Sequence, residues 1–549
     1  MPDHTPATDP WWYIPEELRT RYDLRCRSIP NALRQTAASY PDGTALVGED
    51  GRRTFAELDD EMLLAVRAVQ ALGVRPGDRV AIWAPNCGRW ILAALGALGA
   101  GAVLVPMNTR FKGEEAAYIL RKSGARLLFV ADDFLGNDYL EMLRRADPDS
   151  AVLRPLGTVL LTGTSGDDRI GWAEFLAGGA ALPVEQAVAA IDAIGPDSVS
   201  DIMFTSGTTG HPKGVVLTHG QSLRSHGYYS KLMGFRRADR YLIIPPFFHC
   251  FGYKAGWMAC LVHGVTILPQ ATLDVDEVMR RIEQERVSIL YGPPTVFQAI
   301  LDSPRRPEFD LSSIRNVMAS STVVPPELAS RIRDELRPEG IWSGYGLTEA
   351  SALVTTSVPS DSLDHIVHTV GRPAWEVEVR LVDGDGADVA PGEPGELWVR
   401  GYNVTSGYWE DPERTSEAID SDGWLHTGDV AVRDQDGYFR ITDRIKDMIL
   451  VGGFNVYPAE VERILGQHPD VESIAVVGAP DTRLGEVPVA YVVVRDGATL
   501  TEQEFLSWSA ERIANFKRPR RMIALDALPR NSSMKVLKNV LRDRAAALD

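Results

Sequence analysis

The sequence predicts an α/β protein with a large N-terminal part and a smaller C-terminal part. From about Ser28 to Leu268, helical stretches alternate with short apolar runs, a pattern that predicts parallel strands joined by crossover helices. From about Val377, Gly, Pro and Asp separate short alternating strands, and a second α/β pattern begins after Asp447. The chain has 549 residues. Single hydrophobic cores stop growing beyond roughly 250–300 residues, so we expect at least two domains.

The large part alternates between helices and strands as an α/β sheet requires. Its most apolar stretch, Trp90 to Met107, is interrupted by glycines and ends in Val-Leu-Val-Pro. A helix that leads into a buried strand accounts for this stretch better than a membrane span does. The expected helices are 56–72, 276–284 and 325–336, and the expected strands are 79–83, 102–106, 126–131, 288–291 and 341–343.

The C-terminal third divides into a β-rich stretch and a compact α/β stretch. Short strands are expected at 378–382, 395–400 and 437–442, and a charged segment at 442–447 separates them from the α/β stretch. In that stretch we expect helices at 458–467 and 502–513 and strands at 473–480 and 487–494. The predicted organisation is an N-terminal extension at 1–27, a large domain at 28–445 with a β-rich subdomain at about 377–442, and a C-terminal domain at 446–549.

Charge and cysteine content limit the classes of partner. The net charge is −18, whereas nucleic acid and anionic membrane surfaces are bound by clustered Lys and Arg, so neither partner is expected. The cysteines, Cys26, Cys87, Cys250 and Cys260, form no CxxC pair and no metal-ligand spacing, which is typical of reduced thiols. The N-terminus is acidic and rich in proline, unlike a signal peptide. We therefore expect a cytoplasmic protein without a membrane span.

A polar, glycine-rich segment comes directly after the apolar run at 202–204. It reads TSGTTGHPKG from Thr205 to Gly214, and its Gly, Ser and Thr residues expose backbone N–H groups and hydroxyls that can surround a polyphosphate. Lys213 adds a positive charge. The segment is not a Walker A loop, because it has Pro212 at the position where a Walker A loop has the Gly before its Lys. A flexible polar turn is the alternative interpretation, but a match of this length rarely arises by chance.

With this segment and five others in order, the chain resembles the adenylate-forming superfamily of acyl-CoA synthetases, luciferases and peptide-synthetase adenylation domains. The resemblance extends from about Ser28 to Arg542, nearly the whole chain. It implies a large N-terminal domain with stacked sheets and a β-rich subdomain, and a small, mobile C-terminal α+β domain. The motifs that carry it are Thr205–Gly214, Gly344–Glu349, Gly423–Asp429, Asp443–Asp447, Gly452–Glu462 and Leu528–Lys535.

The resemblance implies that the chain uses ATP, Mg²⁺ and coenzyme A to activate a small carboxylic acid. Tyr345 offers an aromatic face to adenine, Glu349 is a hard oxygen ligand suited to Mg²⁺, and Lys535 would neutralise charge as pyrophosphate leaves. The implied catalytic residues are Lys535, Lys213, Thr348, Glu349 and His249. The implied cofactor-binding residues are Thr205, Ser206, Gly207, Thr208, Thr209, Gly210, Ser320, Ser321, Thr322, Gly344, Tyr345, Gly346, Asp429, Arg444, Gly452 and Gly453.

The resemblance also implies an acyl pocket and a hinge. The segment PFFHCFGY, from Pro246 to Tyr253, is similar to the family's aromatic pocket motif, in which His249 would lie beside the acid carboxylate. For Phe247 and Phe248 a core role explains the residues equally well. The C-terminal domain would rotate about Lys446, bringing Lys535 to the site in one pose and Gly452 and Gly453 in the other. The implied pocket residues are His249, Phe251, Gly252, Tyr253, Val296, Ser320 and Leu347.

Two positions depart from the family pattern. Met534 precedes Lys535 where the family usually has Gly, and a β-carbon forbids backbone angles that Gly tolerates. The loop on the adenine side reads Ala-Ser-Ser-Thr at 319–322, where Gly and Ala are usual. Both departures bear on formation of the adenylate and neither on the segment that would receive CoA.

The segments FFHCFGYKAG, DLSSIR, ITDRIKDM and RLGEVP are most similar to those of actinobacterial CoA ligases for bulky alicyclic acids, including acids derived from steroids or terpenoids. Fatty and aryl acids stay open as substrates. One alternative is a ligase that performs only the thioester step on an adenylate from a partner enzyme; another is a ligase that loads a carrier protein. A non-enzymatic nucleotide-binding regulator would have lost Lys535 and Glu349, and both are present. A homo-oligomer is neither predicted nor excluded.

Overall fold

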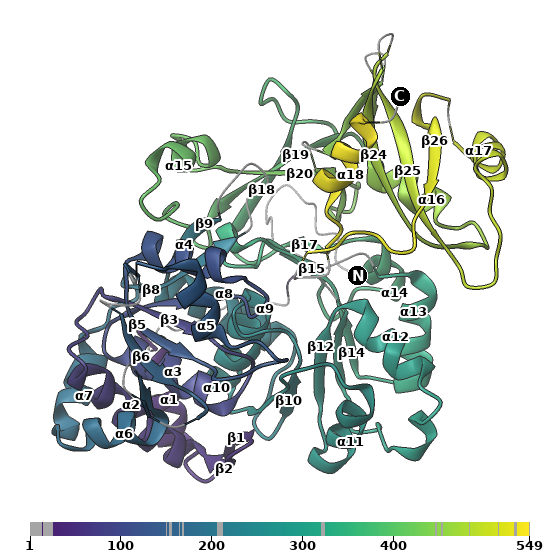
Figure 1. Ribbon diagram of the computed structural model, residues 1–549. Helices are drawn as coiled ribbons and strands as arrows, with labels where there is room; N and C mark the ends of the chain where they lie inside the picture. Colours follow the sequence, from purple (N-terminus) through teal and green to yellow (C-terminus); the bar gives the residue numbers. More distant parts are fainter. Residues whose placement is uncertain are drawn as a thin grey trace. The chain divides into compact units, whose positions relative to one another are not determined.

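In the computed structural model of the protein, the chain forms two compact units (Figure 1). Unit 1 comprises the residues up to Glu378 together with Val399–Leu425, and unit 2 comprises Val379–Trp398 together with His426–Asp549. The structure describes residues 14, 26–149, 151–152, 156–163, 165–166, 169–205, 212–319, 324–444, 447–451, 454–481, 484–513, 515–531 and 535–547, with the backbone alone at 443, 444, 454 and 455.

The first sheet of unit 1 has the strand order β7-β6-β5-β3-β4-β8-β9, and its early strands are purple and blue in Figure 1. Neighbouring strands are parallel except β8 and β9, which are antiparallel. The strands are β3 (Arg79–Trp83), β4 (Val103–Pro106), β5 (Ala125–Val130), β6 (Gly157–Leu160), β7 (Ile170–Gly171), β8 (Val199–Thr205) and β9 (Lys213–Thr218).

Helix α2 (Phe55–Ala71) begins at a capping box, in which Thr54 and Glu57 satisfy each other's backbone N–H groups. It packs closely against α3 (Gly88–Gly99) and α6 (Trp172–Ala180), because both partners present glycine at the contact. A β-carbon at Gly96 would lie 2.8 Å from Cβ of Ala65. The other helices before residue 240 are α1 (Ile29–Ser39), α4 (Gly113–Ser123), α5 (Tyr139–Ala146), α7 (Val184–Ala193) and α8 (His219–Leu232).

The second sheet of unit 1 has the order β14-β13-β12-β10-β11-β1-β2, parallel except for the pair β1 and β2. Apolar side chains of α11, α12 and α13 pack on its strands in one continuous core. The strands are β1 (Thr44–Gly48), β2 (Gly51–Thr54), β10 (Arg240–Ile243), β11 (Thr266–Pro269), β12 (Ile289–Gly292), β13 (Asn316–Ala319) and β14 (Gly340–Trp342); the helices are α9 (Cys250–Gly252), α10 (Ala259–His263), α11 (Val275–Glu285), α12 (Pro294–Asp302) and α13 (Pro326–Arg331).

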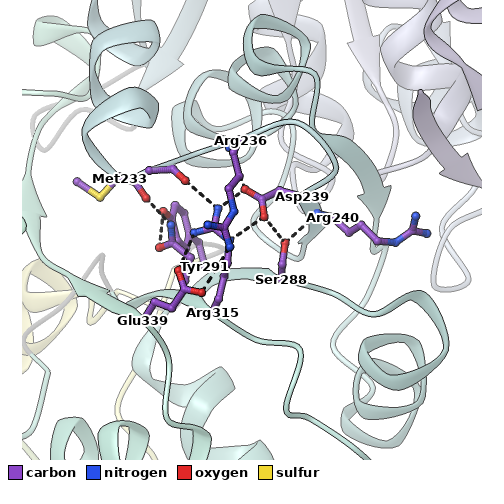
Figure 2. A network of polar contacts seen from close by, with 10 residues as sticks. Met233, Arg236, Asp239, Arg240, Ser288, Tyr291, Arg315 and Glu339 are labelled. Carbon is purple, nitrogen blue, oxygen red and sulfur yellow. Dashed lines mark hydrogen bonds and ion pairs between the residues drawn. The ribbon is translucent and has the colours of Figure 1, made fainter. Parts of the chain in front are cut away.

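A polar network ties together the amino ends of three strands of this sheet (Figure 2). Asp239, Ser288 and Arg315 each directly precede a strand: β10, β12 and β13 respectively. The Ser288 hydroxyl and the Arg315 Nε both donate to Asp239 Oδ1 at 2.8 Å, and the backbone N–H of Arg236 donates to Oδ2 at 2.9 Å. Asp239 is only 4% exposed, so these donors replace the water that its carboxylate loses.

Unit 1 also contains the small sheet β15-β16-β17, and the strands of a four-stranded sheet, β18-β19-β20-β21, in which β20 and β21 are antiparallel, lead into unit 2. The division between the units falls inside β18, β19 and β20. These elements are β15 (Gly344–Tyr345), β16 (Thr355–Thr356), β17 (Arg372–Pro373), β18 (Val377–Val382), β19 (Pro394–Gly401), β20 (Leu425–Arg433) and β21 (Phe439–Arg444), with α14 (Leu363–His368) and α15 (Pro412–Ala418) between them.

Unit 2 is built on the sheet β23-β22-β25-β24, with β26 parallel to β25. Apolar residues of α16 and α17 form one core cluster on this sheet, and those of α18 form a second. Helices therefore cover the sheet with two separate cores. The elements are β22 (Ile449–Val451), β23 (Phe454–Val456), α16 (Pro458–Leu465), β24 (Val471–Asp481), β25 (Gly485–Val494), α17 (Glu502–Ala510), β26 (Arg521–Ala524) and α18 (Lys538–Ala546).

The predicted α/β class and the stacked, largely parallel sheets are confirmed, and most expected elements lie within one or two residues of their positions. The helix expected at 325–336 differs, because α13 ends at Arg331 and is continued by a π-helical turn, Ile332–Leu336. Most residues of the β-rich strands belong to unit 2, together with the C-terminal residues. The sequence pattern assigns the β-rich subdomain, about 377–442, to the N-terminal domain. The boundary at 446 stays a prediction, because Lys446 lies outside the described residues.

Candidate active site

The residues predicted to bind the acid and adenine follow the carboxyl ends of four neighbouring strands, β10, β12, β13 and β14. His249 follows β10, Val296 follows β12, and Gly344 to Glu349 follow β14. Ser320, Ser321 and Thr322 follow β13 but lie outside the described residues. In open α/β sheets, ligands bind outside the carboxyl ends of the strands, so a ligand is expected at this edge of the sheet, and the roles of these residues stay predictions.

The two ends of the predicted phosphate loop are held together by β8 and β9. These strands form an antiparallel pair whose register places Thr205 opposite Lys213. The chain therefore leaves and re-enters the sheet at one point. Ser206, Gly207, Thr208, Thr209 and Gly210 lie between the two strands and outside the described residues, so their role stays a prediction.

A tight turn places Thr348 and Glu349. After the 3-10 turn Thr348–Ala350, Ser351 and Ala352 both adopt left-handed backbone angles, with φ of 52° and 59°. A β-carbon at Gly346 would lie 2.2 Å from the carbonyl carbon of Ala352, so only glycine fits where the turn closes on itself. Non-glycine residues in this region are strained, and such strain is found at functional sites.

The carboxylate of Glu349 has a partner that the sequence did not indicate. The Tyr408 hydroxyl donates to Glu349 Oε1 at 3.0 Å, and the Lys213 ammonium lies 4.7 Å from the centre of the Tyr408 ring. Burial, together with the negative charge of Glu349, raises the pKa of Tyr408 above its usual value, so the phenol stays protonated and donates. The structure thus brings two predicted catalytic residues, Lys213 and Glu349, to one side chain.

The predicted acyl segment is a neighbour of this turn. Burial raises the pKa of Cys250 to about 12, and Thr348 and Glu349 are among the groups that act on its thiol. The surrounding protein lowers the pKa of His249 although its side chain keeps contact with solvent. Contact with water limits this lowering of the pKa. Because the usual pKa of a histidine is already below 7, His249 is neutral at pH 7.

The predicted pocket residues divide into accessible and buried ones. Phe251 and Leu347 are partly exposed, and the ring of Phe251 stacks on that of Tyr291 with 6.4 Å between the ring centres. Tyr253 is fully buried, and its ring stacks on that of Trp257 with 4.8 Å between the ring centres. Val296 belongs to the core of the second sheet. A β-carbon at Gly252 would lie 2.2 Å from the carbonyl oxygen of Pro245, so Gly252 is required by packing.

A buried ion pair directly adjoins the acyl segment. Lys254 is the second residue of a π-helical turn, Tyr253–Met258, and its ammonium lies 2.9 Å from Asp201 Oδ1 and 2.6 Å from the Ser222 hydroxyl. Both charged side chains are wholly buried. Burial, and after it the charge of Lys254, lowers the pKa of His219 to about 3, so that imidazole is neutral. Asp201 lies on β8, four residues before Thr205, so the pair joins the acyl segment to the strand that leads into the phosphate loop.

Unit 2 holds the remaining predicted residues. Asp429 is 3% exposed, and its register partner on the neighbouring strand is Arg444, the other residue predicted at the ribose. Lys535 is exposed. The backbone N–H of Asn531 donates to the carbonyl of Lys535 at 2.8 Å, and the backbone N–H of Lys535 donates to Asn531 Oδ1 at 2.9 Å. Gly452, Gly453 and Met534 lie outside the described residues.

Comparisons with known proteins identify the family of the chain. The chain matches the family model of AMP-binding enzymes over residues 33–409 and the model of the AMP-binding enzyme C-terminal domain over residues 460–535. A relative from Mycobacterium tuberculosis is 46% identical over 517 residues, which are 94% of this chain and 99% of the relative. It is named a CoA ligase for the 3-(7a-methyl-1,5-dioxo-octahydro-1H-inden-4-yl)propanoyl group.

A relative from Rhodococcus jostii bears the same name and is 44% identical over 521 residues, 94% of this chain and 98% of the relative. The crystal structure of the anthranilate CoA ligase AuaEII in complex with anthranoyl-AMP superposes with a TM-score of 0.84 at 26% identity, covering 96% of this chain and all of that one. The chain therefore belongs to the AMP-binding enzyme family. Within that family it is an AMP-forming acyl-CoA ligase.

Membrane-spanning helices and clusters of metal ligands are both missing from the part of the chain that the structure describes. Among these residues, no helix combines the length and the apolar character that crossing a bilayer requires. In the same ranges, no three His, Cys, Asp or Glu side chains gather as a metal site.

Proposed function

We propose that the protein converts a carboxylic acid, ATP and coenzyme A into an acyl-CoA, AMP and pyrophosphate through an acyl adenylate, and that its acid carries a bulky, fused alicyclic ring system. Two relatives at 44–46% identity are both named for the same methyl-dioxo-octahydroindenyl propanoyl group. Their agreement is the observation that carries the proposed substrate class. The segments of the acyl site that resemble ligases for such acids support it.

In the first half-reaction, a carboxylate oxygen of the acid attacks the α-phosphorus of ATP, and pyrophosphate leaves. The loop from Thr205 to Gly210 and the Lys213 ammonium would hold the β- and γ-phosphates, and the Thr348 hydroxyl would donate to the α-phosphate. The Lys535 ammonium would offset the negative charge that the carboxylate and the α-phosphate bring together. The neutral His249 would lie beside the acid without adding a charge.

The residues of the turn fit a magnesium ion. Mg²⁺ is bound by one or two carboxylates together with waters and substrate phosphates, and Glu349 offers one carboxylate, whose partner Tyr408 also contacts Lys213. A cage of several acidic residues, which the described part of the chain lacks, is not needed for this ion. When bound, the ion would neutralise charge on the phosphates.

In the second half-reaction, the CoA thiol attacks the acyl carbonyl carbon, and AMP leaves with the bonding electrons of the acyl–oxygen bond. Asp429 would accept hydrogen bonds from the ribose hydroxyls, and Arg444, opposite it, would donate to the ribose or the phosphate. Gly452 and Gly453 would line the path of the pantetheine arm after rotation about Lys446. These residues all lie beyond residue 426, in the part of the chain assigned to unit 2.

Acid-dependent exchange of pyrophosphate into ATP tests the first half-reaction and the substrate class together. We expect a fused-ring propanoic acid to support faster exchange than octanoate or benzoate. Faster exchange with octanoate would reject the proposed substrate class.

Glu349→Gln tests the role of the carboxylate. Loss of one charged oxygen ligand costs several kcal/mol of transition-state stabilisation, so exchange should fall at least about 100-fold. Capture of a synthetic acyl adenylate by CoA should persist, because that step forms no pyrophosphate. Exchange at the unmutated rate in saturating Mg²⁺ would reject the assignment of Glu349.

A further inference from the structure

The segment from Asn403 to Trp409 is bound to the strand that begins with Lys213. The backbone N–H of Val216 donates to the carbonyl of Gly407 at 3.0 Å, and that of Trp409 donates to the carbonyl of Gly214 at 2.7 Å. Tyr408 itself forms an isolated bridge with Val215. These bonds fix the backbone of Tyr408 beside the start of β9.

The same segment is bound to the turn that carries Glu349. The backbone N–H of Thr405 donates to the carbonyl of Glu349 at 2.7 Å. The Asn403 amide donates to the carbonyl of Leu353 at 2.7 Å, and the Ser351 hydroxyl donates to the carbonyl of Asn403 at 2.9 Å. Asn403 is fully buried, so its bonds are not shared with water. They brace the turn at Ser351, where the backbone is left-handed.

Between these two attachments, the side chain of Tyr408 reaches both charged groups. Its hydroxyl bonds one oxygen of the Glu349 carboxylate, and its ring lies under the Lys213 ammonium. The backbone N–H of Tyr408 donates to the Thr415 hydroxyl at 2.9 Å, which fixes the start of the side chain. One side chain thus contacts two charged groups that come from different elements, Lys213 from the start of β9 and Glu349 from the 3-10 turn Thr348–Ala350.

We propose that Tyr408 is a positioning residue for the binding of metal-bound ATP. It holds the Glu349 carboxylate with one oxygen engaged, so that the other oxygen is presented to the ion, and it supports Lys213 toward the phosphates. Ordering these two flexible side chains before ATP binds lowers the entropy cost of binding. The inference rests on the proposed function, because it assigns the polyphosphate and its ion to this cluster.

Tyr408→Phe separates the hydroxyl from the ring. The variant loses the bond to Glu349 and keeps the aromatic face under Lys213. Calorimetric titration then compares three ligands: ATP with Mg²⁺, ATP with EDTA, and AMP. We expect affinity for ATP with Mg²⁺ to fall about 10-fold, the loss expected for one hydrogen bond to a charged group. Affinity for AMP should not change, because AMP lacks the phosphates that the ion would bridge.

Two further variants complete the test. Tyr408→Leu also removes the ring, so affinity for ATP with EDTA should fall as well. Tyr402→Phe is the matched control: Tyr402 is six residues earlier in the chain, and its ring lies 3.8 Å from the guanidinium of Arg224. Its affinity for ATP with Mg²⁺ should equal that of the unmutated protein.

The outcomes distinguish the inference from the function on which it rests. If the unmutated protein binds ATP no better with Mg²⁺ than with EDTA, the proposed function fails at this site. If it does bind better and Tyr408→Phe preserves the difference, the positioning role is wrong. A variant that weakens AMP and ATP equally, with a lower melting temperature, would show that Tyr408 only supports the fold.

Discussion

Asp201 and Asp239 are two buried carboxylates of unit 1 that differ in their partners and in their place on the sheets. Asp239 precedes β10 and accepts hydrogen bonds from Ser288, Arg315 and the backbone at Arg236 (Figure 2). Asp201 lies inside β8 and has as its counter-charge the ammonium of Lys254. The first network lies at the amino ends of strands, whereas the second lies on the strand that leads into the phosphate loop.

The two carboxylates therefore have different tasks: one holds a sheet, and the other joins two parts of the candidate site. Asp239, Ser288 and Arg315 directly precede three neighbouring strands, so the bonds among their side chains fix the register of the second sheet. Lys254 directly adjoins the acyl segment, and Asp201 precedes the phosphate loop. A change at Asp239 should therefore affect stability alone, and a change at Asp201 or Lys254 should affect stability and acid activation.

Lys254→Met should give the largest effect, because it leaves Asp201 wholly buried without its counter-charge. Breaking a buried pair from one side costs about 3–5 kcal/mol. Urea unfolding followed by tryptophan fluorescence measures this loss. In the protein that remains folded, acid-dependent pyrophosphate exchange should also fall. An unchanged urea midpoint would show that the pair contributes nothing.

Arg315→Met should cost less, about 1.5–3 kcal/mol, the range for a hydrogen bond to a charged group. Asp239 keeps the Ser288 hydroxyl and the N–H of Arg236 as donors. Pyrophosphate exchange by the folded variant should match that of the unmutated protein. A loss of exchange equal to that of Lys254→Met would remove the distinction between the two networks.

Asp59 is a partly buried carboxylate, with a side chain 18% exposed, and its pairing is weak: its Oδ1 lies 3.8 Å from Nε of Arg34. Burial raises its pKa from 3.8 to about 6. A carboxyl with a raised pKa in the folded state stabilises the protein below pH 4, and this contribution is lost as the pH rises through 6. Asp59→Asn should therefore raise the unfolding free energy at pH 7 by about 1–2 kcal/mol.

The difference between the two proteins should shrink from pH 7 to pH 4, as Asp59 takes up its proton. Urea midpoints at both pH values measure it, and other titrating groups cancel in the comparison. An equal difference at both pH values would contradict the raised pKa.

The double variant Lys254→Met with Asp201→Asn should have the smallest effect, within about 1 kcal/mol of the unmutated protein, because replacing both members of a buried pair is often neutral. Together with both single variants it forms a double-mutant cycle. If exchange stays low in this variant while stability returns, the pair positions the site. If the double variant is as unstable as Lys254→Met alone, the cost of that change does not come from an unpaired charge.

The sequence could predict the fold class and the positions of nearly all the elements that it named, because the alternation of apolar runs and helical stretches is a local signal. The break of the helix at Arg331 could not be predicted, since the π-helical turn after it has the same apolar spacing as a continued helix. The grouping of the β-rich strands depends on contacts between distant residues, which the pattern does not contain.

The candidate site shows the same limit. The motifs identified Lys213 and Glu349, but Tyr408 comes far later in the chain and meets them only in the folded protein. The segment Gly407-Tyr408-Trp409 carried no chemical signal on its own. Lys254 belongs to the segment FFHCFGYKAG, but an isolated lysine is ordinarily a solvated charge; its complete burial beside Asp201 is visible only in the structure.

We propose that the protein makes an acyl-CoA from a fused-ring alicyclic acid, with AMP as the second product. The most direct measurement is mass spectrometry of the products after the unmutated protein is incubated with ATP, Mg²⁺, CoA and a pooled panel of alicyclic, fatty and aryl acids. We expect the CoA thioester of a fused-ring propanoic acid to form fastest, in equal amount with AMP. Formation of ADP, or of thioesters from the fatty or aryl acids alone, would contradict the claim.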